Sequence, residues 1–165
     1  MPSPGVAVAV CGGLAMAGGV TWLFVSPSGA PARAPASQHL AAPASKLAVI
    51  DGETLRIGDD VVRLAGIAAP RRDTRCEVRG GVSQDCGVAA ANALAALVRR
   101  GPIECTIHGR DSRGRPLGDC QTAGVSLSQA QVRDGWAVAR EVSLKDMEAE
   151  ARSAGRGVWR NGGDS

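Results

Sequence analysis

Three short polar motifs contain the residue types best suited to chemistry. Residues 51–54 read Asp-Gly-Glu-Thr, residues 63–71 read Arg-Leu-Ala-Gly-Ile-Ala-Ala-Pro-Arg, and residues 111–117 read Asp-Ser-Arg-Gly-Arg-Pro-Leu. Carboxylate oxygens are ligands for hard cations such as Ca²⁺, and the planar guanidinium group of arginine can bind phosphate through two parallel hydrogen bonds. Residues of these types could bind a hard cation, an anionic group, or both.

The amino-acid composition limits what else such a site could contain. Seventeen of the 19 basic residues are arginines, a bias that a GC-rich genome also produces, and the net charge of +3 is too small to predict nucleic-acid binding by itself. The chain has three Trp, one Phe and no Tyr, which excludes a tyrosine nucleophile and argues against a broad aromatic surface for single strands. With 44% apolar and 21% charged residues, the 165-residue chain is predicted to contain one globular domain.

The N-terminal part of the chain differs in composition from the rest. Residues 5–25 form an uncharged run of 21 residues, long enough as a helix to cross a hydrocarbon core of about 30 Å. We expect an N-terminal hydrophobic helix within residues 1–25, either an uncleaved membrane anchor or a signal peptide whose cleavage would release a secreted protein. Residues 26–45 are rich in Pro, Ala and Ser and are expected to form a tether. The expected folded domain spans residues 46–161, followed by a tail at residues 162–165.

The rest of the sequence alternates short strands with helices, and these elements must position the three motifs. We expect strands at residues 47–50, 54–57, 61–64, 102–108 and 116–122, and helices at residues 84–100, 126–133 and 143–154. Ser83 and Ser143 are the expected N-caps of the first and last helix, and residues 68–83 are expected to form a loop. Five short strands with about three helices predict an α+β fold built on a five-stranded, OB-fold-like β-barrel.

Four cysteines outside the apolar segment indicate the compartment. Cys76 and Cys86 flank a glycine-containing loop, and Cys105 and Cys120 lie on the two arms of the expected hairpin. Of the three possible pairings, the bridges Cys76–Cys86 and Cys105–Cys120 are the simplest, and the spacing lacks the Cys-x-x-Cys pairs typical of a zinc site. Disulfides predict an extracytoplasmic domain, periplasmic or at the cell surface. The basic residues after the apolar segment weakly favour the opposite orientation, unless a basic segment precedes Met1.

The motifs also stand in the order and spacing of a known family. Together with residues 127–136 and the closing Gly-Val-Trp at residues 157–159, they resemble the staphylococcal nuclease, or thermonuclease, family over residues 47–159. The resemblance implies an enzyme that hydrolyses phosphodiesters in DNA and RNA with one Ca²⁺. In that family two aspartates bind the ion, a glutamate orients or deprotonates the attacking water, and two arginines hold the phosphate and its developing charge.

Four residues match the binding groups that the resemblance implies. Arg63 and Arg115 correspond to the two phosphate-binding arginines and are the candidate catalytic residues. Glu53 takes the place of one metal-binding aspartate but is one methylene longer, and Asp51 lies in the same turn, so both are candidate metal ligands. A structural interpretation is also open, in which Arg63 pairs with Glu53 or Asp51 and Arg115 pairs with Asp111.

Three other positions depart from the family pattern. Ala68 replaces the second metal-binding aspartate and has no oxygen to offer, Arg71 reverses the charge of the catalytic glutamate, and Arg113 replaces a tyrosine. Loss of a positioned general base costs about 10²–10⁴ in rate, and loss of a charged ligand weakens Ca²⁺ binding. We therefore expect little or no nuclease activity, unless a shift of the loop brings Asp73 into the place of the missing carboxylate.

Two functions are compatible with this pattern. The first is a non-catalytic module that binds nucleic acid or another polyanion, or acts as a scaffold, and contacts the membrane through residues 5–25. The second is a weak or altered nuclease that uses Glu53 as its main Ca²⁺ ligand. The sequence indicates no particular protein partner.

Overall fold

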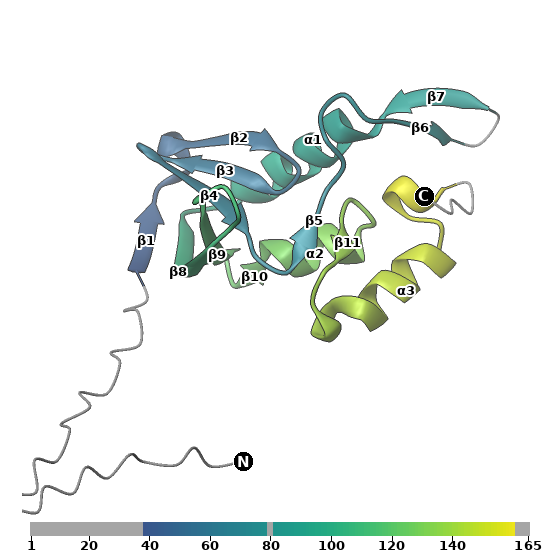
Figure 1. The fold of residues 1–165 in the computed structure, drawn as a ribbon. Helices are drawn as coiled ribbons and strands as arrows, with labels where there is room; N and C mark the ends of the chain where they lie inside the picture. The colour runs from purple at the N-terminus through teal and green to yellow at the C-terminus, as the bar shows by residue number, and fades with distance from the viewer. Residues whose placement is uncertain (1–37, 79–80, 161–165) are drawn as a thin grey trace, which may run out of the picture. The chain divides into compact units, whose positions relative to one another are not determined.

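The structure, a computed structural model, describes residues 38–78 and 81–160 (Figure 1). The predicted N-terminal helix, its membrane contact and the predicted tail at residues 162–165 lie outside the described residues. Within the part of the chain that is described, no helix has the length and apolar character needed to cross a membrane.

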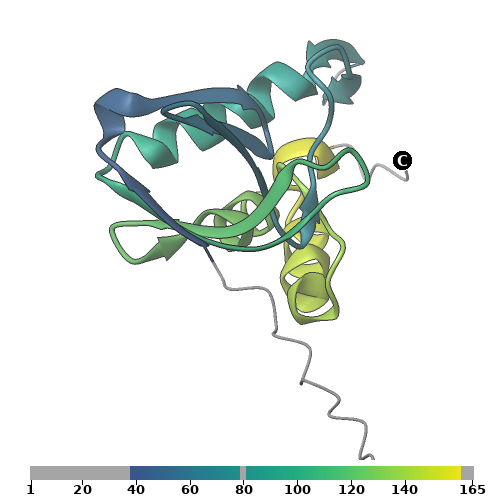
Figure 2. The same cartoon turned by 60° about the vertical axis from the view of Figure 1, so that its left-hand side comes forward.

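A curled sheet of seven strands forms the centre of the fold (Figure 2). Its strands are β1 (Gln38–Ala42), β2 (Leu47–Asp51), β3 (Thr54–Ile57), β4 (Asp60–Leu64), β8 (Ile103–Arg110), β9 (Pro116–Thr122) and β10 (Val125–Ser126). They follow the order β1-β8-β9-β4-β3-β2, with β10 paired to β9, and only β4 and β9 pair in parallel. The five predicted strands correspond to β2, β3, β4, β8 and β9, and the predicted α+β, OB-fold-like architecture is confirmed.

These segments form strands because core-facing apolar residues alternate with residues that face away from the core. Leu55 and Ile57 of β3, Val62 and Leu64 of β4, and Ile103 of β8 are buried in the hydrophobic core. Successive side chains of a strand point to opposite faces, so the residues between them face away from the core. Arg63, between Val62 and Leu64, belongs to this outward-facing set and lines the pocket described below.

Three α-helices pack on the sheet and on one another, as predicted. They are α1 (Cys86–Val98), α2 (Leu127–Arg133) and α3 (Lys145–Ser153), and three 3₁₀ helices accompany them: η1 (Ala44–Lys46), η2 (Val142–Leu144) and η3 (Gly157–Trp159). Helix α1 contacts β2, and α2 contacts both β9 and α3. The sheet and the helices therefore share one core, to which Leu94 of α1 and Leu127 of α2 contribute fully buried side chains.

The helix starts differ from the predicted ones. Asp85 caps α1, because its Oδ1 accepts a hydrogen bond from the Val88 amide at 2.8 Å, whereas Ser83 lies in the preceding strand. Ser143 lies inside η2 and caps nothing, since α3 begins only at Lys145. The predictions of Ser83 and Ser143 as N-caps were wrong because a neighbouring residue, or a preceding 3₁₀ turn, already occupies the start of each helix.

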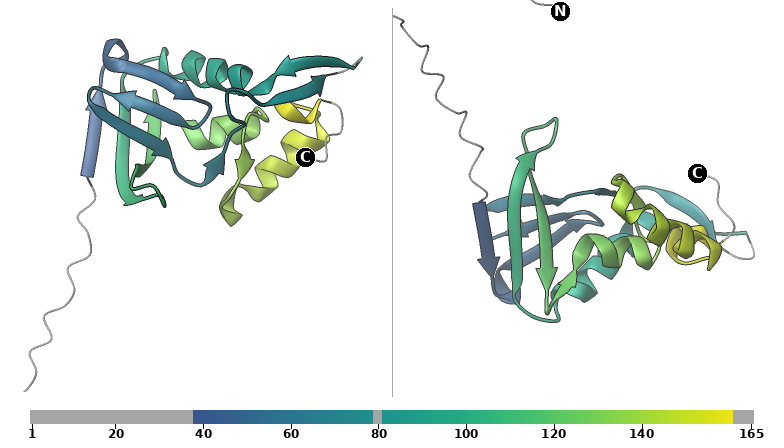
Figure 3. Two further views of the ribbon diagram at one scale, coloured as in Figure 1. Left: turned by 45° about the horizontal axis from the view of Figure 1, so that its top comes forward. Right: turned by 90° about the horizontal axis from the view of Figure 1, so that it is seen from below.

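Short strands also occur in and beside the predicted loop. Strand β5 (Ile67–Ala68) ends at the first residue of that loop and pairs with β11 (Val138–Ala139), and the hairpin of β6 (Arg75–Val78) and β7 (Val82–Asp85) begins within it. This hairpin extends away from the curled sheet (Figure 3). Strand β1 lies within the stretch predicted as a tether, so the sheet begins before residue 46. Strands β5 and β11 have only two residues each, and β1, β6 and β7 consist mostly of small or polar residues, so their sequences carry no clear apolar period.

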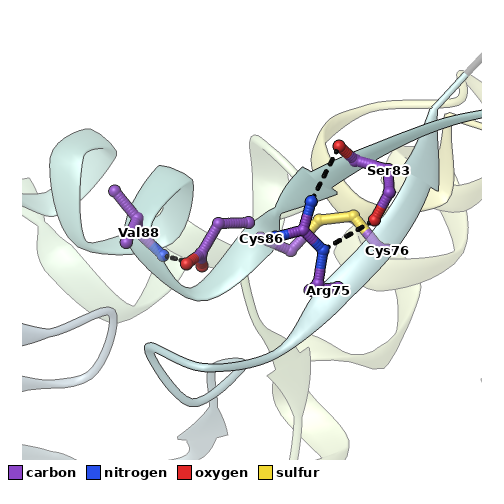
Figure 4. The surroundings of a disulfide bond; sticks show 6 residues. Arg75, Cys76, Ser83, Cys86 and Val88 are labelled. Carbon is purple, nitrogen blue, oxygen red and sulfur yellow. Dashed lines mark hydrogen bonds between the residues drawn. A yellow bond between two sulfur atoms is a disulfide. The ribbon is translucent and has the colours of Figure 1, made fainter.

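Two disulfides link segments of the fold, in the predicted pairing. Cys105 and Cys120 are directly opposite each other on β8 and β9, with a Cα–Cα separation of 4.1 Å, and both are buried in the core. Cys76 of β6 is joined to Cys86, the first residue of α1, with a Cα–Cα separation of 5.8 Å (Figure 4). The first bridge lies inside the sheet, and the second ties the projecting hairpin to the helix.

Candidate functional site

One open pocket brings together every site residue that the sequence predicts. It is lined by Ile50, Asp51, Glu53, Arg63, Ala68, Ala69, Arg71, Arg72, Asp73, Asp111, Ser112, Arg113 and Arg115. Strand register explains the gathering: Arg63 pairs with Leu117 across the parallel β4–β9 junction, and Arg115 lies two residues before Leu117. Thr54 pairs with Arg63 across β3 and β4, so Glu53 lies beside Arg63 as well.

Glu53 is the most buried acid of the pocket and is fully engaged. The residue is 8% exposed; its Oε1 lies 2.6 Å from the Arg63 guanidinium, and its Oε2 accepts a hydrogen bond from the Ala69 amide at 3.0 Å. Burial raises the pKa of the Glu53 carboxyl, and the Ala69 amide and Arg63 only partly oppose this effect. The structural interpretation of Arg63, as a partner of Glu53, is confirmed, while Asp51 instead accepts the Glu53 amide at 2.9 Å.

Asp111 holds the second predicted arginine. Its Oδ2 lies 2.7 Å from both Nε and a terminal nitrogen of Arg115, and its Oδ1 accepts the amides of Arg113 and Arg115 at 2.9 Å each. Burial acts to raise the pKa of Asp111, but these hydrogen bonds together hold that pKa below its ordinary value. Gly114 has a φ of +78° in this turn, which glycine adopts at little cost. The turn therefore fixes the direction of the Arg115 side chain.

Three further arginines form the rim of the pocket, here called the rim arginines: Arg71, Arg72 and Arg113. The Arg71 side chain is 84% exposed and lies 3.6 Å from Asp73, which is 79% exposed, so this ion pair contributes little. Arg72 donates to the carbonyl oxygens of Ile50 and Val49 on β2. Together with Arg63 and Arg115, they give the pocket five guanidinium groups and four carboxylates, a formal net charge of +1.

A residue that the sequence did not predict supports the turn at residues 51–54 from the core side. Gln131 of α2 is fully buried, and its Nε2 donates to the carbonyl oxygens of Gly52 at 2.7 Å and Ala90 at 3.1 Å. A Cβ on Gly52 would lie only 2.7 Å from the Cβ atoms of Ala69 and Ala90. The turn that carries Glu53 is thus clamped between α1, α2 and the loop after β5. A buried glutamine in a short helix has no distinguishing sequence signal, so only the tertiary contacts reveal this role.

The residues present do not fit a Ca²⁺ site. Calcium takes about six to eight oxygen ligands, and no three acids, histidines or cysteines come close enough to hold a metal ion among the described residues. Both Glu53 oxygens are occupied by cationic or N–H donors, and the Asp51 Oδ1 closes its own turn. Ala68 offers no oxygen, and Asp73 lines the pocket but faces Arg71.

Comparison with known proteins shows the family of this chain. The family model described as "Staphylococcal nuclease homologue" matches residues 61–161. The chain belongs to the staphylococcal nuclease family. It is also 35% identical over 118 residues to the "Succinoglycan biosynthesis protein ExoI" of Rhizobium meliloti (strain 1021), a match that covers 68% of this chain and 62% of that relative. The matched region thus spans less than two thirds of the relative's length. Members of the family are in general Ca²⁺-dependent and bind nucleic acid.

Proposed function

We propose that this domain binds polyanions in the arginine-lined pocket and does not hydrolyse them. The observation that carries the proposal is the state of Glu53. The carboxylate that would bind the metal ion is neutralised by Arg63 and capped by the Ala69 amide. Ala68 and Arg71 stand where the family pattern has the second metal ligand and the catalytic base, so two further requirements for hydrolysis are missing.

The arrangement of the arginines supports anion binding. Arg63 and Arg115 are held in fixed directions by acids, and their side chains remain 25% and 28% exposed toward the pocket. A phosphate group can approach these exposed edges, while the rim arginines supply further positive charge around it. Glu53 and Asp111 reduce the charge of the inner pair, so the rim arginines would contribute most of the salt-dependent affinity.

The test combines a cleavage assay with a binding assay on the same protein. We expect no cleavage of denatured DNA in Ca²⁺ beyond that in EDTA, and binding of a fluorescein-labelled oligothymidylate that EDTA leaves unchanged. Arg115→Ala should weaken binding about tenfold, since a charged hydrogen bond contributes about 1.5 kcal/mol. Arg100→Ala, at an exposed arginine after α1, is the matched control and should bind as wild type. Ca²⁺-dependent cleavage that disappears in Arg115→Ala would overturn the proposal in favour of a nuclease that uses Glu53.

We further propose that the domain lies outside the cytoplasm. The two disulfides support this location, because cytosolic thiols are kept reduced. The residues 5–25 would then serve as an anchor or as a signal peptide. Maleimide labelling of intact and lysed cells tests the location: all four cysteines should resist labelling until the protein is reduced, and free thiols at all four would remove the argument.

The relative is named for succinoglycan biosynthesis. The binding assay should therefore include an acidic polysaccharide as well as DNA.

A further inference from the structure

The loop that carries two rim arginines is held from one side by the start of α1. This arginine loop, residues 69–74, lines the pocket through Ala69, Arg71, Arg72 and Asp73. The carbonyl oxygen of Thr74 accepts hydrogen bonds from the amides of Cys86 at 2.9 Å and Gly87 at 3.4 Å. The loop and the first turn of the helix therefore move as one unit while these bonds persist.

Gly87 shows how closely the two segments approach. A Cβ at this position would overlap the carbonyl oxygen of Arg71 and the Cα of Arg72. No side chain larger than hydrogen fits between the loop backbone and the helix. The direction in which Arg71 and Arg72 leave the backbone is thus set by where the first turn of α1 lies.

The Cys76–Cys86 bridge is the covalent link between these segments. It joins a residue two positions after the arginine loop to the first residue of α1. The hairpin between the two cysteines is a two-stranded ribbon, which is marginally stable by itself. Among the described side chains, Arg75 and Ser83 join its two strands by exposed hydrogen bonds (Figure 4), whose net contribution to stability is modest. Without the bridge, the loop would be held on the helix by the Thr74 hydrogen bonds and the packing at Gly87 alone. The hydrogen bonds of Ala69 and Arg72 run to Glu53 and β2 and not to the helix.

The two bridges also differ in accessibility. Cys105 and Cys120 are 2% and 3% exposed and Cys86 is 1% exposed, whereas Cys76 is only half-buried. Thiol–disulfide exchange needs access to one sulfur. A thiolate of a dithiol reductant can attack Cys76 Sγ, and Cys86 leaves as a thiolate that takes up a proton. The second thiol of the reductant then attacks the mixed disulfide, which releases the Cys76 thiol and the oxidised, cyclic reductant.

We propose that the Cys76–Cys86 bridge positions the arginine loop for polyanion binding and is the selectively reducible bridge of this domain. Reduction then weakens anion binding without unfolding the sheet, because the bridge inside the sheet stays closed. The expected change in affinity rests on the proposed anion-binding function. The positioning of the arginine loop by the bridge does not depend on that function.

The test compares three forms of the full chain: the oxidised protein, the protein after mild dithiol treatment, and the double variant Cys76→Ser/Cys86→Ser. In both perturbed forms we expect the affinity for labelled oligothymidylate to fall about tenfold and the slope of log affinity against log salt to flatten by about 1.4, because two arginines no longer contact phosphate. Thiol mapping should show Cys105 and Cys120 still bridged, and far-ultraviolet circular dichroism should be unchanged. Unchanged affinity in the double variant, or opening of both bridges together, would overturn the proposal.

Amide hydrogen exchange separates this proposal from the proposed function. In the double variant the amides at positions 86 and 87, which bond to the Thr74 carbonyl oxygen in the wild type, should exchange at least tenfold faster, while those of β8 and β9 should keep their protection. Accelerated exchange in a protein that does not bind the oligonucleotide even when oxidised would remove the proposed function and leave the bridge as the positioning device. Unchanged exchange would refute the link itself.

Discussion

Replacing Glu53 by glutamine tests the chemistry of the pocket most directly. Glutamine keeps an oxygen for the Ala69 amide and almost the same volume, but removes the charge that neutralises Arg63. In the wild type, acid should have the same effect as the substitution. Since burial raises the pKa of Glu53 above 4.5, the carboxyl takes up its proton earlier than an ordinary glutamate as the pH falls, and Arg63 is then free for an anion.

The expected size follows from the charges of the pocket. Loss of the Glu53 charge changes the formal net charge of the lining residues from +1 to +2. One additional counterion should then be released on binding, so the salt dependence for single strands steepens by about 0.7 and the affinity rises about three- to tenfold at low salt. The wild type should approach the affinity of Glu53→Gln as the pH is lowered, while the variant itself should show no such dependence.

The pH dependence of stability has a definite sign. Between 4.5 and the raised folded pKa, the folded state binds more protons at Glu53 than the unfolded state does. The free energy of unfolding therefore falls as the pH rises through this window, and the contribution of Glu53 is largest below 4.5. Glu53→Gln should lack this component in urea titrations at a series of pH values.

The assay is fluorescence anisotropy with labelled oligothymidylate at several salt concentrations and at pH 5 to 8. Glu150→Gln, an exposed acid on α3, is the matched control and should leave affinity and salt dependence unchanged. Weaker binding in Glu53→Gln, or loss of a Ca²⁺-dependent activity in that variant alone, would contradict the reasoning, because either result would mean that the carboxylate serves a ligand rather than Arg63.

Three further predictions concern the scaffold of the pocket. Gly87→Ala should lower the free energy of unfolding by about 2 kcal/mol or weaken anion binding through a displaced loop, because the new Cβ would overlap the Arg71 carbonyl. Gly109→Ala is the control: a Cβ at this position has no atom within 4 Å, so neither quantity should change. Gln131→Leu should cost about 1–3 kcal/mol in urea denaturation, since the buried Gly52 carbonyl loses its donor; an unchanged midpoint would mean that water or relaxation replaces that donor. Because the pKa of Asp111 is lowered in the folded state, its carboxylate stabilises the fold above pH 3.8, and this contribution is lost as the pH falls through the folded pKa. The fall in Tm at acid pH should therefore be smaller in Asp111→Asn than in the wild type. Identical plots of Tm against pH would contradict the assignment.

Much of the fold could be predicted because its signals are local. The alternation of apolar residues in β3 and β4, and in the β8–β9 hairpin, records which face of each strand is buried. The hairpin of β6 and β7 has no such alternation, since it lies outside the core and is tied by a disulfide. Strand β1 has Leu40 among small and polar residues at the sheet edge and is recognised only through its pairing with β8.

The sequence by itself determined which chemical groups are available. It placed Arg63, Arg115 and Glu53 in a recognisable order, and it already showed that Ala68 and Arg71 lack the oxygens a metal ion and a base require. It also limited the cysteines to three pairings. These are properties of residue type and spacing, and no folding can supply a carboxylate that the chain does not contain.

Only the tertiary structure decided what these groups do to one another. Sequence reasoning left Arg63 as either a phosphate ligand or a partner of an acid, and the register of β3 with β4 places it 2.6 Å from Glu53. The Gln131 clamp and the contact between Gly87 and the arginine loop join segments far apart in the chain. Such relations depend on distances of a few ångströms between elements, because hydrogen bonds and ion pairs lose most of their strength beyond that range.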